Sequence, residues 1–265
     1  MEQGVVGRVA LRIATAVVLA FIYIPISLVV IYAFNASGTS EWPPSGFTLD
    51  WVAAAIANAG LRDAFLTSIV CALGATAVAM VLGALASLAV ARYAFFGRES
   101  ISFVVILAIA LPGIVTGMAL STAFATLGVP LGFLTIVAGH ATFCIVLVYN
   151  NAIARLRRTS RSLEEASADL GADTFQTFRY VTFPALRSAL IAGGLLAFAL
   201  SFDEVIVTLF MAGGVKTLPI WIFQSFRLAN QVPLVNVVGV AAILLSVIPV
   251  YLATRLSGGV AGART

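Results

Sequence analysis

Residues 101–154 read ISFVVILAIALPGIVTGMALSTAFATLGVPLGFLTIVAGHATFCIVLVYNNAIA, and none of them is charged. A transmembrane helix needs only about 20 consecutive apolar residues, so this stretch is long enough for two such helices. The sequence GVPLG at 128–132 lies inside it, and Gly and Pro in close succession interrupt helices. We therefore expect two membrane spans here, at about 101–127 and 132–153.

Other uncharged runs flank this stretch on both sides. They cover residues 13–40, 64–91, 188–202 and 228–254, and the third is interrupted by Asp203 and Glu204 before it resumes at Val205. Only 10% of the chain is charged, against about 25% in soluble domains. The sequence therefore predicts an all-α polytopic membrane protein, a single domain over residues 1–265 with six spans at about 12–34, 64–91, 101–127, 132–153, 187–213 and 232–255.

The basic residues are distributed unevenly over the ends of these spans. Of the 15 Lys and Arg residues, all but Arg62, Lys216 and Arg227 lie at one set of ends, which includes Arg264 near the C-terminus. The positive-inside rule then places both termini and the loop after residue 153 in the cytoplasm. The net charge of +4 reflects this topology and gives no reason to expect nucleic-acid binding.

The loop after the fourth span, the longest between spans on this side, is polar, aromatic and regularly punctuated. Ser162 to Glu165 fits a capping box, which predicts a helix from Leu163 to about Leu170 that stops at Gly171. Asp173 to Gln176 offers a second start, and that second helix is expected to end at Phe183-Pro184, with Pro184 in the first turn of the fifth span. The alternative is a loop that lies on the membrane surface, with its phenylalanines in lipid and its arginines at headgroups.

The punctuation of this loop resembles the EAA motif of ABC importer permeases. That motif is Glu-Ala-Ala, three residues, Gly, nine residues and Ile-x-Leu-Pro. Here it reads Glu165-Ala166-Ser167, Gly171 and Val181-x-Phe183-Pro184, with three mild departures at Ser167, Val181 and Phe183. The resemblance implies two short helices at about 163–183 that dock on a separate ATPase subunit, through Glu164, Glu165, Ala166, Ser167, Asp169, Gly171, Ala172, Phe175, Phe178 and Pro184.

The chain itself has no phosphate-binding loop, because its only lysine, Lys216, is not part of a G-x-x-x-x-G-K-[ST] motif. We expect no enzymatic site, no metal site and no cofactor bound by this chain. ATP and Mg would act on the partner ATPase.

A second resemblance runs along nearly the whole chain, to the spermidine/putrescine-type (PotC-like) branch of these permeases. It rests on FIYIPI at 21–26, GFTLDWV at 46–52, SFDEVIVTLFMAGG at 201–214 and TLPIWIF at 217–223, among others. It implies the ABC type I importer permease fold in a bacterial inner membrane, a second homologous permease, an ATPase dimer and an external solute-binding protein. The branch also includes relatives thought to carry opines or 4-aminobutyrate, so the cargo stays open between polyamines and amino-acid-like solutes.

Asp203 and Glu204 are candidates for the substrate pathway. A carboxylate within a membrane span is costly unless solvated or partnered, so it marks a functional site by default. The sequence places both about 24 Å along the fifth helix from Arg187. Adjacent residues point about 100° apart, so only one need face a cationic cargo. A structural role, as a buried ion pair or a hydrogen bond between helices, is equally compatible with the sequence.

Pro112 and Gly113, within ALPGIVTG at 110–117, are the other pathway candidates. Proline removes a backbone hydrogen bond, and broken helices at membrane depth tend to line cavities, although simple packing is the alternative. His140 is the only histidine, and we expect a satisfied polar residue in a helix interface rather than a metal ligand.

Two other functional classes fit less well. A secondary transporter could use Asp203 or Glu204 as a proton relay, but it leaves the helix–Gly–helix loop unexplained. An intramembrane protease would need a motif such as H-E-x-x-H or G-x-S-x-G, and neither occurs.

Overall fold

A computed structural model describes residues 5–228 and 231–258, so Arg264 and the chain ends lie outside the described residues. The described residues are almost entirely helical and contain no β-strand, only an isolated bridge between Asn35 and Phe47. The prediction of an all-α protein is confirmed.

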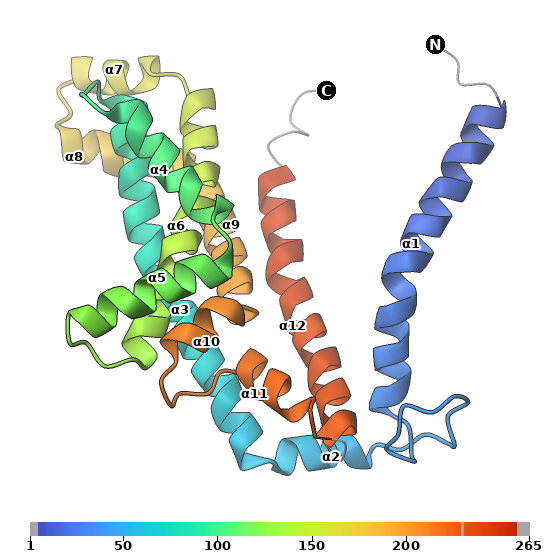
Figure 1. The fold of residues 1–265 in the computed structure, drawn as a ribbon. Helices are drawn as coiled ribbons and strands as arrows, with labels where there is room; N and C mark the ends of the chain where they lie inside the picture. Colours follow the sequence, from blue (N-terminus) through green and yellow to red (C-terminus); the bar gives the residue numbers. More distant parts are fainter. Residues whose placement is uncertain (1–4, 229–230, 259–265) are drawn as a thin grey trace. The chain divides into compact units, whose positions relative to one another are not determined.

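The elements of Figure 1 are α1 (Val5–Ala33), α2 (Asp50–Ala57), α3 (Ala59–Arg92), α4 (Arg98–Ala110), α5 (Gly113–Thr126), α6 (Phe133–Arg158), α7 (Ser162–Asp169), α8 (Thr174–Thr177), the π-helical segment η1 (Phe178–Thr182), α9 (Phe183–Phe202), α10 (Ile206–Met211), α11 (Leu218–Ser225) and α12 (Val232–Gly258).

The chain divides into two compact units. Among the described residues, one unit comprises those up to Arg62 together with those between Ile222 and Leu244, and the other comprises Asp63–Trp221 together with those from Leu245 to Gly258. In the first unit, the loop after α1 is held by Asn35, whose carbonyl accepts a hydrogen bond from the Trp51 indole at 3.0 Å. All candidate functional residues belong to the second unit.

The described residues contain five helices that are long and apolar enough to cross a membrane. They are Gly7–Ala33, Ala59–Arg92, Phe133–Arg158, Thr174–Phe202 and Val232–Leu256. A sixth span is present only if α4 and α5 are taken together, and these two helices meet at an angle of 107°. The membrane-protein prediction is therefore supported, with a sharp bend in one span.

Two of the predicted spans are interrupted in the structure. The span expected at 101–127 is broken at Leu111, whose backbone is extended because the residue before a proline is disfavoured in the helical conformation. The span expected at 187–213 begins earlier, as part of a helix from Thr174, and is broken between Phe202 and Ile206. Both breaks lie beside predicted pathway residues.

The core of the second unit is built around α6, which packs mainly against α9. Small residues allow this close approach: a Cβ added to Gly193 of α9 would lie 3.1 Å from the Cα of Val148 in α6. Helix α3 also contributes small buried side chains to this core, among them Ala72, Ala75 and Ala79. Such small-residue contacts are the usual basis of helix association in membranes, where lipid removes the hydrophobic driving force.

Gly83 of α3 provides a test of this packing. A Cβ there would lie 2.9 Å from Val148 Cβ, 3.0 Å from the Ile145 carbonyl oxygen and 3.1 Å from the Tyr149 nitrogen. Because two of these atoms belong to the backbone of α6, the helices must separate to admit it. We expect Gly83→Ala to lower the free energy of unfolding by about 1–3 kcal/mol in detergent titrations.

The matched control for this substitution is Gly60→Ala in the same helix, where the nearest atom is the Asn58 side-chain oxygen at 3.5 Å. We expect no loss of stability there. An equal loss at both positions would contradict the inferred close contact between α3 and α6.

Candidate functional site

The α7–α8 pair, residues 162–169 and 174–177, forms the predicted helix–Gly–helix element at one end of the second unit (Figure 1). Gly171 connects the two helices with φ of +86°, the left-handed conformation that glycine adopts without steric cost. The Gly171 and Ala172 amides return hydrogen bonds to the carbonyls of Ala168 and Ser167, which satisfies the end of α7. The prediction that Gly171 terminates the first helix is confirmed.

The sequence predicted two helix starts, one capped by Ser162 and one by Asp173, and only the second is confirmed. In the second, the Gln176 amide donates to Asp173 Oδ1 at 2.8 Å, and the Asp173 amide donates to Gln176 Oε1 at 2.9 Å. The first is wrong, because Arg161 already has helical backbone angles and Ser162 lies inside the first turn. The Ser162 hydroxyl instead bonds the Ser160 hydroxyl at 2.6 Å.

The second helix does not end at Phe183-Pro184, as the sequence suggested. It continues through η1 into α9, so that residues 174–202 form one long helix. Pro184 lies in the first turn of α9 as predicted, and its missing N–H and its ring disrupt the regular bonding of the preceding turn. The Phe183 amide accordingly bonds the Phe178 carbonyl, five residues back, in the wider π turn. Helix α8 is thus continuous with a membrane helix, and α7 is joined to it through the turn at Gly171.

The ten predicted docking residues are divided between two faces. The outward face is exposed and carries apolar as well as acidic side chains, with Phe175 at 68% exposure. Its members are Glu165, Ala166, Asp169, Gly171 and Phe175, and Pro184 is exposed at the start of α9. Phe178 is 38% exposed and lines a cavity together with Arg92 and Glu164, so it lies on the inward side. Glu164, Ser167 and Ala172 are half-buried on the inward face, where the Ser167 and Thr177 hydroxyls lie 3.1 Å apart and join α7 to α8.

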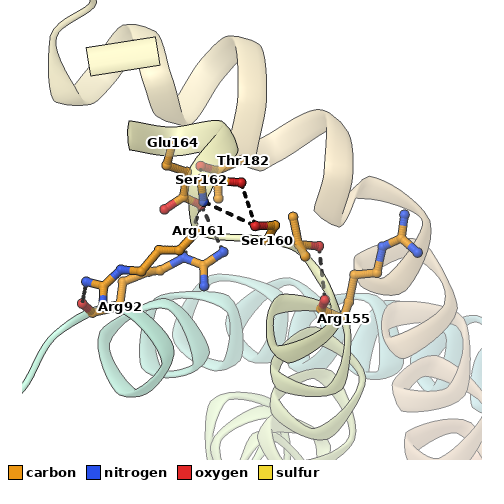
Figure 2. A network of polar contacts seen from close by, with 8 residues as sticks. Arg92, Arg155, Ser160, Arg161, Ser162, Glu164 and Thr182 are labelled. Carbon is orange, nitrogen blue, oxygen red and sulfur yellow. Dashed lines mark hydrogen bonds and ion pairs between the residues drawn. The ribbon is translucent and has the colours of Figure 1, made fainter. Parts of the chain in front are cut away.

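Glu164 contacts residues that sequence reasoning missed (Figure 2). Its Oε1 accepts hydrogen bonds from Arg92 Nε at 3.0 Å and from Thr182 Oγ1 at 3.0 Å, and it lies 2.9 Å from Arg92 Nη2. Arg161 donates in return to the carbonyl of Arg92, the last residue of α3, at 2.7 Å. Glu164 and Arg92 are 72 residues apart, and no local pattern links them.

Asp203 and Glu204 lie in the break between α9 and α10 rather than within a continuous helix. The Glu204 carboxylate accepts the Val207 amide at 2.9 Å, and its carbonyl accepts the Thr208 hydroxyl at 2.7 Å. Glu204 therefore caps the start of α10, a position where a carboxylate satisfies an otherwise unpaired N–H. Asp203 is exposed. The two carboxylates thus have different environments.

His140 joins α6 to both sides of this break. It is 1% exposed, and its Nδ1 and Nε2 lie 2.8 Å from the hydroxyls of Ser201 in α9 and Thr208 in α10 respectively. Both ring nitrogens therefore have partners. The expectation of a satisfied polar residue in a helix interface is confirmed, and the residue holds the two helix ends in fixed positions.

The two helix breaks border a common cavity of about 200 Å³. Leu111, Gly113 and Thr116 line it from the α4–α5 break, and Glu204 and Val207 line it from the α9–α10 break. The structure therefore brings Gly113 and Glu204 to one place. Pro112, the residue before α5, is exposed and does not line the cavity, and neither does Asp203.

His140→Ala tests the role of this histidine in the helix break. The change leaves a cavity and removes the partner of the Ser201 hydroxyl and one of the two partners of the Thr208 hydroxyl, so we expect the free energy of unfolding to fall by about 2–4 kcal/mol. Ser201→Ala, which removes one of the two bonds, is the control and should cost under about 1 kcal/mol. Equal stability of the wild type and His140→Ala in detergent unfolding titrations would contradict the bridging role.

Comparison with known proteins gave consistent matches. The model of the family of binding-protein-dependent transport system inner membrane components matches residues 79–262. The putrescine transport system permease protein PotI of Escherichia coli (strain K12) is 34% identical over 217 residues, which cover 78% of this chain and 76% of PotI. The spermidine/putrescine transport system permease protein PotC of the same strain is 31% identical over 247 residues, which cover 92% of each chain.

A solved structure shares the fold over its whole length. It is a bacterial ABC transporter involved in the import of the acidic polysaccharide alginate, with a TM-score of 0.69, 17% sequence identity and full coverage of both chains. At this identity the likeness supports the ABC importer permease fold and carries no information about cargo.

Proposed function

The chain belongs to the family of binding-protein-dependent transport system inner membrane components, and from that premise we propose that it is the membrane-spanning permease subunit of an ATP-driven importer for polyamines. It supplies one half of the translocation pathway. A separate ATPase dimer, a second homologous permease and an external solute-binding protein complete the transporter. The chain lies in a bacterial inner membrane, with both ends on the cytoplasmic side, as the distribution of basic residues favours.

Coupling to the ATPase is assigned to the outward face of the α7–α8 pair. This face combines the exposed carboxylates of Glu165 and Asp169 with the exposed ring of Phe175, a mixture suited to a groove on another protein. Helix α8 continues through η1 into α9, so a displacement of α8 moves a membrane helix with no loop between them. Motion of the motor can therefore reach the pathway as a rigid-body displacement.

The cargo assignment rests chiefly on one observation, the exposed carboxylate of Asp203 in the break directly after the membrane helix that ends at Phe202. A polyamine is a string of ammonium groups, and a carboxylate at a helix break gives such a cation a transient partner. The half-buried Glu204 adds negative charge beside it, although its side chain also caps α10. The names of PotI and PotC, transport permeases for putrescine and spermidine, support the same class of cargo.

Uptake competition tests the cargo. Proteoliposomes containing the whole transporter and its binding protein are loaded with ATP, and uptake of labelled putrescine is measured against unlabelled competitors. We expect putrescine or spermidine to compete, and 4-aminobutyrate and opines to have no effect. Competition by 4-aminobutyrate or an opine alone would overturn the polyamine assignment and leave the importer assignment in place.

A further inference from the structure

Glu164 and Glu165 are neighbours in the sequence, yet the structure gives them opposite surroundings. Glu165 is exposed on the outward face of α7, where a partner protein can reach it. The Glu164 side chain is only 18% exposed, and the Arg92 side chain that it contacts is 13% exposed. This is the one ion pair within the part of the chain that the structure describes. A pair shielded to this degree is screened by salt less than a surface pair.

The contacts of Glu164 join three separate elements. Arg92 is the last residue of α3, Glu164 lies in the first turn of α7, and Thr182 is the last residue of η1 and is 7% exposed (Figure 2). Arg161, the residue directly before α7, donates to the Arg92 carbonyl, so the start of α7 is bonded to the end of α3 a second time. The donors to Glu164 Oε1 include a guanidinium, and charge-assisted hydrogen bonds of this kind are the strong ones.

Covalent connections alone leave α7 poorly fixed. On one side it joins α6 through the short segment at 159–161, and on the other it joins α8 through the turn at Gly171. The end of α6 is already tied to α9 by Arg155, whose Nε donates to the Ala185 carbonyl at 2.9 Å. Besides the contact of Ser167 with Thr177 and the bond from Arg161 to the Arg92 carbonyl, Glu164 is the side chain of α7 that bonds both α3 and η1.

We propose that Arg92, Glu164 and Thr182 form a latch that fixes α7 to the ends of α3 and η1, so that displacement of the α7–α8 pair is passed to α3 as well as to α9. This inference rests on the proposed function. It makes Glu164 a positioning residue that acts from inside the permease, rather than a contact with the ATPase. Arg92, which lies outside the EAA-like segment, becomes part of the coupling machinery.

The test compares Glu164→Gln with Glu165→Lys in the reconstituted transporter. Two quantities are measured: the amount of ATPase subunit that co-purifies, and the amount of solute taken up per ATP hydrolysed. We expect Glu164→Gln to retain the ATPase subunit and to lower uptake per ATP about tenfold, within the range of ordinary coupling free energies. Glu165→Lys should instead reduce the co-purified ATPase.

The exchange variant Arg92→Glu with Glu164→Arg provides a readout that a loss of folding cannot imitate. It restores opposite charges across the same contact, so uptake per ATP should recover to at least about half of the wild-type value, as expected for residues that interact directly. Thr182→Val, which removes one uncharged donor, should have a smaller effect than Glu164→Gln.

Two results would overturn the latch. One is loss of the ATPase subunit in Glu164→Gln to the extent seen in Glu165→Lys, which would make Glu164 a docking residue. The other is wild-type uptake per ATP in Glu164→Gln. If Glu165→Lys retains the ATPase subunit, the docking face is assigned wrongly, and uptake per ATP in the Glu164 and exchange variants still decides the latch by itself.

Discussion

Gly171→Val should lower uptake to below about a tenth of the wild-type rate while the protein still inserts into the membrane. The turn holds this residue at φ of +86°, and the left-handed conformation costs an L-residue roughly 1–2 kcal/mol, more when the side chain is β-branched. No atom lies within 4 Å of the added Cβ, so the effect comes from the backbone and not from a clash. Relaxation of the turn changes the angle between α7 and α8. We expect the misaligned pair no longer to fit the groove that we propose on the ATPase subunit.

Gly97→Val is a closely matched control for this substitution. Gly97 has φ of +85°, its added Cβ also meets no atom within 4 Å, and it lies in the turn between α3 and α4, outside the α7–α8 pair. We expect it to retain at least about half of wild-type uptake, because its strain of about 1–3 kcal/mol is the same but acts elsewhere. Normal uptake by Gly171→Val would show that the α7–α8 pair does not couple transport to ATP hydrolysis.

Asp203→Asn is expected to reduce polyamine uptake roughly tenfold to a hundredfold without loss of the assembled transporter. The exposed carboxylate lies between α9 and α10, where no helical backbone bonds depend on its side chain. Asparagine keeps the shape and removes the charge. A hydrogen bond to a charged group contributes about 1.5–3 kcal/mol, which corresponds to this range of rates. Initial uptake rates and co-purification of all subunits are measured side by side.

Glu204→Gln separates the two neighbouring carboxylates. Its amide oxygen can still accept the Val207 N–H, so the cap of α10 is preserved and we expect a much smaller effect on uptake than in Asp203→Asn. Glu204→Ala removes the cap and should cost about 0.5–2 kcal/mol of stability. If Asp203→Asn fails to assemble while transport per assembled complex is normal, Asp203 is structural and the cargo assignment loses its main support.

Much of the fold could be predicted because its determinants are local. Uncharged runs identify membrane helices directly, since the bilayer excludes charge over a fixed thickness. Gly171 and the pair Asp173 and Gln176 were predicted correctly for the same reason: left-handed turns and capping boxes involve residues within four positions of one another.

The features that sequence reasoning missed depend on distant residues or on competition between local signals. The break after Phe202 was missed because the apolar run resumes at Val205, directly after Asp203 and Glu204, and because the break is held by His140 from another helix. Pro184 looked like a stop signal, but a π turn accommodates it without ending the helix. The ion pair between Arg92 and Glu164 arises only when α3 and α7 come together in the fold.

The central claim is that this chain transports only when driven by a separate ATPase, and one measurement tests it most directly. The chain is purified from its native membrane in mild detergent with whatever accompanies it, reconstituted into vesicles, and assayed for putrescine uptake with and without ATP in the presence of the binding protein. We predict that a subunit with a phosphate-binding loop co-purifies and that uptake requires ATP. A chain that purifies alone and takes up solute in response to an ion gradient without ATP would contradict the account and identify a secondary transporter.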